Sequence, residues 1–288
     1  MPSEPPTVKN WLKYIRNELT GFYPEKEGSS LSQYILEELL SVSKPVLFSI
    51  SHQTIDKSTG SKIKYIVSEL KKEKPIQYIL GKTQFYGCTI RVRPGVLIPR
   101  PETEELVQWI INDYKGKEIT ILDVGTGSGC IAIALAKNLK GSTIYATDHS
   151  DICLETAGKN AALNSIHINL IQHDVLSENI IPGIPKLDIL ASNPPYITES
   201  EKNAMRSNVI KYEPPEALFV PDNNPLIYYH GILTTARLKL KEKGSLYLEI
   251  NENMFGKIHT LLERNGFSNI ILRKDINGKD RMVKAQLV

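Results

Sequence analysis

The first quarter of the chain carries apolar residues at helical spacing and shows no strand-like alternation. One helical face is formed by Trp11, Tyr14, Ile15 and Leu19. The spacing returns at 31–40, where Ser29 and Ser30 offer an N-cap, at 63–70, and in a short segment around Val46 to Ile50. These segments predict a small helical bundle over residues 1–74. We interpret it as a substrate-docking domain, because it precedes the part of the chain that carries the chemistry.

A different pattern begins at Pro75, which ends the helical region. Gly81 and Gly87 bracket short β-prone runs and predict a two-stranded ribbon. Residues 96–101, Val-Leu-Ile-Pro-Arg-Pro, form a connector that the prolines make stiff. We therefore interpret residues 75–100 as a linker with a short β-ribbon, and residues 101–288 as a second domain. That domain is expected to begin with a helix whose first turn is acidic.

From residue 118 onward, short apolar runs alternate with helical segments. The runs predict strands at 119–124, 143–147, 168–172, 187–191 and 245–250, with a final pair at 270–273 and 282–288. Helices are predicted at 128–139, 152–164, 225–240 and 253–264. Alternation of strands and helices is typical of an α/β fold with a mostly parallel sheet, which here has seven strands.

Composition and charge limit the functions that the chain can have. The chain has 288 residues, of which 41% are hydrophobic and 23% charged, and a formal net charge of +3. This mild charge does not predict a nucleic-acid surface. The cysteines and histidines lack metal-ligand spacing, so we expect reduced thiols and no metal site. No apolar stretch is long enough to span a membrane, and we expect a soluble, cytoplasmic protein.

A glycine-rich turn, Asp-Val-Gly-Thr-Gly-Ser-Gly at 123–129, joins the first predicted strand to its helix. Glycines there allow a tight turn and let a ligand approach backbone N–H groups at a helix N-terminus. The candidate cofactor-binding residues in this turn are Gly125, Thr126, Gly127, Ser128 and Gly129. Several classes of nucleotide-binding fold use such a turn.

Acidic residues follow the next two strands. Asp148 can accept hydrogen bonds from two ribose hydroxyls, or it could cap the helix that follows. Asp174, with Val175 beside it, stands where the amino group of an adenine would be met, or it could cap a turn. The glycine-rich turn and Asp148 fit NAD and S-adenosylmethionine alike.

The tetrapeptide Asn193-Pro194-Pro195-Tyr196 follows the fourth predicted strand. Two prolines cannot continue a strand ladder, so the Asn193 amide is expected at the carboxyl end of the strand. Open α/β sheets bind their ligands at that end. The Asn193 oxygen and the Pro194 carbonyl could accept both hydrogens of a planar NH2 group, with Tyr196 over it. Alternatively, the segment is a proline-rich turn with Tyr196 in the core.

The same tetrapeptide separates the two cofactor classes. Hydride transfer to a carbonyl substrate needs a proton donor or acceptor, whereas this strand end offers an amide and two prolines. These groups favour a nitrogen nucleophile that attacks an electrophilic methyl group. The sequence therefore favours S-adenosylmethionine over NAD.

These features resemble a known family. The glycine-rich turn together with residues 193–196 is similar to class I methyltransferases that modify a planar NH2 nitrogen. Further segments resemble the HemK/PrmC family of release factor glutamine N5-methyltransferases, and they are residues 75–81, 85–87, 97–104, 213–218, 248–250 and 275–281. The resemblance runs from about residue 75 to the C-terminus. Its most specific part is Pro-Arg-Pro-Glu-Thr-Glu combined with Asn-Pro-Pro-Tyr.

The resemblance implies a Rossmann-like class I S-adenosylmethionine-dependent methyltransferase fold. It implies that the cofactor binds at Gly125 to Gly129, Asp148, Asp174, Val175 and Asn193, and that S-adenosylhomocysteine is the product. Asn193, Pro194, Pro195 and Tyr196 would be the catalytic residues and would hold the glutamine of the GGQ loop of class I peptide-chain release factors. The implied protein is a monomer without direct nucleic-acid contacts. Val175 stands where family members often carry an aromatic residue.

Two other functions use the same residues. A nucleic-acid methyltransferase acting on N6 of adenine or N2 of guanine could use the same amide clamp, although the mild charge disfavours it. A scaffold that binds the cofactor without turnover is a third hypothesis, and the intact Asn193 disfavours it.

Overall fold

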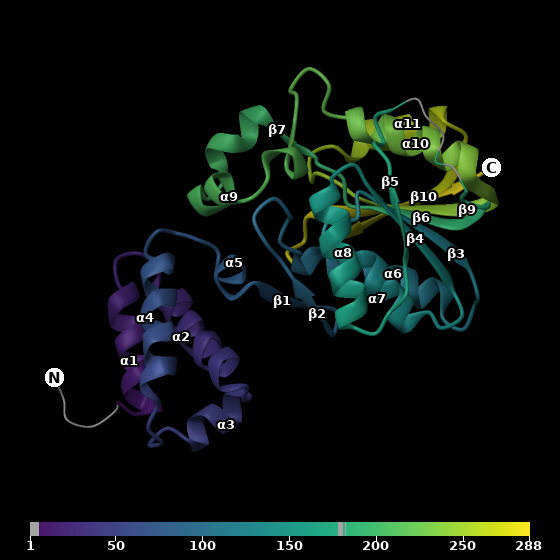
Figure 1. Ribbon diagram of the computed structural model, residues 1–288. Helices are drawn as coiled ribbons and strands as arrows, with labels where there is room; N and C mark the ends of the chain where they lie inside the picture. The colour runs from purple at the N-terminus through teal and green to yellow at the C-terminus, as the bar shows by residue number, and fades with distance from the viewer. Residues whose placement is uncertain (1–5, 178–180, 182) are drawn as a thin grey trace. The chain divides into compact units, whose positions relative to one another are not determined.

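The computed structural model describes residues 6–177, 181 and 183–288, and it divides at Ile79 and Leu80 into two compact units (Figure 1). The first five residues of the helical region predicted at 1–74 lie outside the described residues. No helix in the described ranges is long and apolar enough to cross a membrane.

The first unit consists of helices. They are α1 (Val8–Leu19), α2 (Glu25–Leu40), α3 (Lys44–Ser49), α4 (Lys57–Leu70) and α5 (Ile76–Leu80), which reaches the boundary between the units. The helices predicted from the apolar spacing are present, but the helical region does not end at Pro75, because α5 follows it. Trp11 on α1 packs against α4, where a Cβ at Gly60 would lie 2.8 Å from the indole ring. Gly60 therefore allows the two helices to approach closely.

The predicted start of α2 is wrong. The helix begins at Glu25, with Pro24 at the N-cap position and acidic Glu25 and Glu27 in its first turn. These negatively charged carboxylates interact favourably with the positive end of the helix dipole. Ser29 and Ser30 lie inside the helix, where the Ser30 hydroxyl donates to the Lys26 carbonyl instead of capping.

The predicted ribbon is confirmed in the second unit. Strands β1 (Lys82–Phe85) and β2 (Cys88–Arg91) pair antiparallel. Two asparagines, Asn160 in α8 (Asp151–Leu163) and Asn164 directly after it, hydrogen-bond to the backbone of β2. The side chain of Asn160 bonds both backbone groups of Arg91, and the side chain of Asn164 does the same for Thr89. The ribbon is thereby fixed beside the helices of the sheet.

A seven-stranded sheet forms the centre of the second unit, in the order β10-β11-β9-β6-β3-β4-β5. The strands are β3 (Thr120–Val124), β4 (Thr143–Asp148), β5 (Asn169–Gln172), β6 (Leu187–Ser192), β9 (Leu240–Glu249), β10 (Phe267–Lys274) and β11 (Asp280–Leu287). The pairs among β5, β4, β3, β6 and β9 are parallel, and β11 and β10 add antiparallel pairs. The predicted mostly parallel sheet is confirmed.

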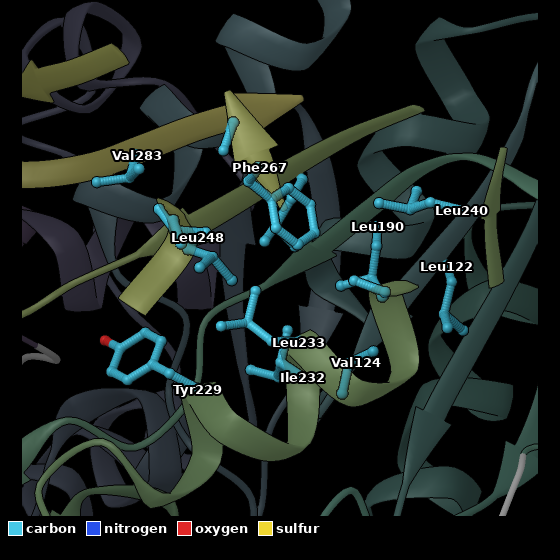
Figure 2. Close-up of a cluster of buried hydrophobic side chains, with 14 of the residues drawn as sticks. Leu122, Val124, Leu190, Tyr229, Ile232, Leu233, Leu240, Leu248, Phe267 and Val283 are labelled. Atoms are coloured by element: carbon cyan, nitrogen blue, oxygen red, sulfur yellow. The ribbon is translucent and has the colours of Figure 1, made fainter. Parts of the chain in front are cut away.

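Helices cover both faces of this sheet (Figure 1). One face carries α6 (Pro101–Tyr114), α7 (Cys130–Asn138) and α8, and the other carries α10 (Ile227–Lys239) and α11 (Phe255–Arg264). Figure 2 shows the core on the second face, where Ile232 and Leu233 of α10 lie among strand residues such as Leu190 and Leu248. Because the strand order reverses at β3, a crevice is expected beyond its carboxyl end.

Several short elements between β6 and α10 were not predicted. Strands β7 (Ile197–Thr198) and β8 (Phe219–Val220) form a parallel pair. Between them lie α9 (Ser207–Tyr212) and two short 3-10 helices, Glu199–Ala204 and Pro215–Ala217. Strands of two residues and helices of six residues or fewer are too short to show a periodic pattern.

Candidate active site

A cavity of about 200 Å³ lies at the carboxyl ends of the central strands. Its lining includes most of the candidate residues, namely Gly125, Thr126, Gly127, Ser128, Asp148, Asp174, Val175, Asn193, Pro194 and Pro195. Gly129 and Tyr196 are not part of this lining. The strand-end positions inferred from the sequence therefore converge on one cavity.

The glycines of the turn have two different roles. Gly125 and Gly127 have φ values of 70° and 55°, and a Cβ on either would meet no protein atom within 4 Å. They leave room at the cavity in a conformation that other residues adopt at a cost. Gly129, with φ of 81°, precedes α7, and a Cβ there would lie 2.9 Å from the Cβ of Ala157 on α8. Gly129 thus permits close helix packing and does not line the cavity.

Asp148 organises the same turn. Its Oδ2 accepts from the N–H of Gly127 at 2.9 Å, and its Oδ1 accepts from the N–H of Ser150 at 3.0 Å. The N-cap of α8 is Ser150, whose hydroxyl accepts from Cys153, so the capping alternative for Asp148 is wrong. Each carboxylate oxygen of Asp148 keeps a further lone pair for a ligand hydroxyl at the cavity.

Asp174 and Val175 also border the cavity. Asp174 Oδ1 accepts from the N–H of Leu176 at 2.9 Å, so this residue stabilises a turn while it also borders the cavity. Tyr228 of α10 lines the same cavity. Its pKa is raised by burial and then by the charges of Asp174 and Glu216. Sequence reasoning missed Tyr228, because nothing in a helical pattern shows which side chain faces a cavity.

A second cavity, of about 320 Å³, shares part of its lining with the first. Tyr196 and Glu102 border it, and Asn193, Pro194 and Pro195 border both cavities. We refer to these three consecutive residues, which both cavities share, as the partition. A cofactor and a substrate could occupy the two cavities and meet at Asn193.

The carboxamide of Asn193 has a defined orientation. Its Nδ2 donates to the hydroxyl of Thr103 at 3.1 Å, and that hydroxyl donates to Glu249 Oε2 at 2.7 Å. Within the described part of the chain, Asn193 Oδ1 accepts no hydrogen bond. The amide oxygen is thus available to accept a hydrogen bond from a ligand, and its residue lines both cavities.

Tyr196 belongs to the same hydrogen-bond network. Its hydroxyl donates to Glu249 Oε1 at 2.9 Å and accepts from Arg281 Nη1 at 3.3 Å. Arg281 is itself bound to Asp275 at 3.1 Å. Burial raises the pKa of Glu249, and the hydrogen bonds from Thr103 and Tyr196 partly oppose this rise.

Sequence reasoning assigned no role in the site to Thr103, Glu249 or Arg281. Each lies in a segment that carried the family resemblance, namely 97–104, 248–250 and 275–281. The location of these three residues in segments that resemble the family was the signal that the sequence offered for their place in the site. It identified the segments without showing that their side chains meet.

The connector before α6 forms a shared wall. Leu97 and Arg100 border both cavities. Arg100 Nη2 lies 2.6 Å from Glu213 Oε1, and the other oxygen of this buried carboxylate accepts from the N–H of Ile98 at 3.2 Å. Glu213 thereby fixes both a side chain and a backbone group of the connector.

Two family models match the chain. One, described as PrmC N-terminal domain, matches residues 10–81, and one described as Methyltransferase small domain matches residues 102–218. Among solved structures, a Thermus thermophilus 16S rRNA N2 G1207 methyltransferase is 18% identical with a TM-score of 0.52, covering 72% of this chain and 50% of that one. This similarity supports the class I methyltransferase fold alone.

Sequence relatives are more informative. A release factor glutamine methyltransferase of Flavobacterium psychrophilum is 42% identical over 281 residues, covering 96% of this chain and 98% of the relative. One of Bacteroides thetaiotaomicron is 40% identical, covering 94% and 97%. The chain therefore belongs to the release factor glutamine methyltransferases, a family of S-adenosylmethionine-dependent enzymes.

Proposed function

We propose that the protein methylates the side-chain amide nitrogen, N5, of the glutamine in the GGQ motif of class I peptide-chain release factors. The observation that carries this proposal is the Asn193 carboxamide, which lines both cavities and is held by Thr103 with its oxygen available. Such an oxygen can bind a substrate NH2 group. The names of the relatives support glutamine as the group that bears it.

The first cavity has the features that S-adenosylmethionine requires. The open turn at Gly125 and Gly127 gives room beside a helix N-terminus, and Asp148 offers lone pairs for ribose hydroxyls. Asp174 and Val175 would border the adenine. Bound there, the cofactor supplies an electrophilic methyl group on a positively charged sulfur.

The proposed hydrogen bonds to the substrate compensate for the low reactivity of its amide nitrogen. A glutamine amide nitrogen is a weak nucleophile, because its lone pair is delocalised into the carbonyl. Acceptance of its two hydrogens by Asn193 Oδ1 and the Pro194 carbonyl fixes the nitrogen at the partition and favours the positive charge that develops on it. Positioning of this kind contributes on the order of 7–11 kcal/mol in well-oriented reactions.

The second cavity would hold the glutamine side chain. The ring of Tyr196 borders it, while the Tyr196 hydroxyl is held by Glu249 and Arg281. The ring can therefore cover the planar amide and exclude water without moving. No strong base is needed, because the amide proton becomes acidic only as the methyl group is transferred.

The alternative substrates are less well supported. The partition alone would also accept the amino group of adenine or guanine, but the relatives named above share most of this chain's length and are release factor methyltransferases. The proposed partner is thus a release factor, met in the cytoplasm by a monomeric enzyme without nucleic-acid contacts. The helices before residue 75 would dock it.

Purified release factors and labelled S-adenosylmethionine provide the test. We expect one labelled peptide, which contains the GGQ motif, with the label on the glutamine side chain. A release factor in which this glutamine is replaced by alanine serves as the control and should take up no label. Labelling of RNA or DNA in place of the release factor would refute the proposal.

A further inference from the structure

We propose that Thr103 and Glu249 are positioning residues that fix the rotation of the Asn193 carboxamide, so that its oxygen and not its NH2 group faces the substrate nitrogen. The proposal rests on the proposed function. It concerns residues that do not touch the reacting atoms and act through Asn193.

The need for such a device follows from the shape of an amide. The oxygen and the NH2 group of a carboxamide are nearly equal in size, so packing alone selects between its two orientations weakly. A rotation by half a turn would present donors to a substrate NH2 group, which needs acceptors. The orientation must therefore be set by hydrogen-bond direction.

Thr103 supplies this direction, because a hydroxyl has only one hydrogen. The hydrogen of Thr103 points to Glu249 Oε2 at 2.7 Å. Only lone pairs remain for Asn193, whose Nδ2 lies 3.1 Å from the same oxygen. The NH2 group of Asn193 must face Thr103, and Oδ1 must face the opposite way.

Glu249 is kept as an acceptor from its other side. The guanidinium of Arg281 can only donate, and it donates to the Tyr196 hydroxyl at 3.3 Å. The single hydrogen of Tyr196 is thus directed to Glu249 Oε1 at 2.9 Å. With Glu249 ionised, every hydrogen between Arg281 and Asn193 therefore has one allowed direction.

Burial makes this order strict. Glu249 and Thr103 are 1% and 2% exposed, so solvent does not offer them substitute partners. Arg281 is held in place by Asp275 and by the carbonyl of Ile250 at 3.2 Å. Arg281, the donor at one end of the network, is therefore held as firmly as Glu249, the acceptor in its middle.

Substitutions of Thr103 test the proposal. Thr103→Val keeps the shape and removes the hydroxyl, which frees Asn193 to populate both orientations. We expect kcat to fall about 3- to 10-fold, the usual value of one hydrogen bond, with KM and cofactor affinity within about twofold. Thr103→Ser retains the hydroxyl and should restore most of the rate. Thr156→Val removes a buried hydroxyl that bonds only within α8, and should leave kcat unchanged.

Glu249→Gln should have the larger effect. Tyr196 and Arg281 require an acceptor at their end, so the new NH2 group would face Thr103 and donate to it. Thr103 would then donate to Asn193 and turn its NH2 group toward the substrate. We expect kcat to fall about 10²-fold or more while cofactor affinity is retained.

A readout without turnover separates this proposal from the proposed function. The side-chain NH2 hydrogens of Asn193 should exchange slowly with solvent in the wild type and in Thr103→Ser, and faster in Thr103→Val. If the wild type fails to methylate release factors, the proposed function fails, and the exchange rates still decide the orientation. Equal exchange and equal kcat in the Val and Ser variants would overturn the positioning role, as would a loss confined to KM or cofactor affinity.

Discussion

Asn193 and Thr103, which are 90 positions apart in the sequence, are joined by a hydrogen bond of 3.1 Å between Nδ2 and Oγ1. One residue follows β6 and the other lies in the first turn of α6. The contact assigns the two ends of the amide to different tasks. The nitrogen is bound to the protein, and the oxygen is left for a ligand.

This division leads to a prediction for Asn193 itself. Asn193→Ala should lower kcat about 10²–10³-fold, by analogy with the loss of one oxyanion donor, while KM changes little. Asn193→Asp keeps an acceptor but removes the donor to Thr103 and brings a second carboxylate near Glu249. We expect it to be nearly as inactive as the alanine variant. Single-turnover methylation, with circular dichroism to confirm folding, measures both, and a near wild-type rate for Asn193→Ala would make the segment a structural turn.

Catalysis is expected to depend on pH through Glu249. Burial raises the pKa of Glu249, and its acceptor role requires the ionised form. As pH falls through this raised pKa, kcat should decrease at a pH above that at which an ordinary glutamate titrates. The groups that act on Glu249 are Thr103, Tyr196, Arg281, Glu102, Tyr229 and Cys130.

Stability should not follow the same profile. A raised pKa in the folded state means that protonation of Glu249 favours folding, and this contribution is lost as pH rises through the raised pKa. Loss of kcat at low pH is therefore separable from unfolding. Rates and melting temperatures measured over one pH series provide the comparison, and an acid limb unchanged in Glu249→Gln would contradict the assignment.

Asp148 is expected to contribute to cofactor affinity. Asp148→Ala should weaken binding of S-adenosylmethionine by roughly 1.5–3 kcal/mol, the usual value of hydrogen bonds to a charged group. Asp151→Ala is a matched control, since this exposed carboxylate at the start of α8 bonds Gln172 and does not line the cavity. Calorimetry measures both variants. Equal affinities would restrict Asp148 to holding the backbone of Gly127 and Ser150.

The first unit is expected to contribute to binding of the protein substrate and not to binding of the cofactor. Among the described residues, all that line the two cavities belong to the second unit, Leu80–Val288. Removal of residues 1–79 should therefore raise KM for the release factor, by about tenfold or more if exposed aromatic residues such as Phe48 and Tyr65 contribute to docking. Affinity for S-adenosylmethionine should be unchanged and also reports folding. Normal methylation by a folded truncation would exclude the docking role.

Asp123 gives a prediction about stability. Burial raises its pKa to about 7, and its Oδ1 has no hydrogen-bond partner among the described residues. The wild type therefore loses stability as pH rises toward 7, because the folded state must then bury a charge. Asp123→Asn removes this cost. Its gain in unfolding free energy should be larger by about 1–3 kcal/mol at about pH 8 than at about pH 5. A pH-independent difference would contradict the shifted pKa.

Much of the fold follows from local sequence. The strands of the sheet and the main helices were predictable, because apolar period and glycine or proline breaks act over a few neighbouring residues. The positions of Asp148 and Asn193 at strand ends were predictable for the same reason, since parallel strands deliver their carboxyl ends to one edge. The first residue of a helix was less predictable. In α2, for example, Pro24 and the Ser29–Ser30 pair both carry helix-start signals.

The tertiary structure alone decided how the site residues work. Thr103, Glu249 and Arg281 come from α6, β9 and β11, and nothing in their neighbours along the chain indicates that their side chains meet. The direction of each hydrogen depends on the next partner, so the orientation of Asn193 is a property of the whole network. A sequence specifies which groups can donate and accept, but their separation and burial arise only when distant elements pack together.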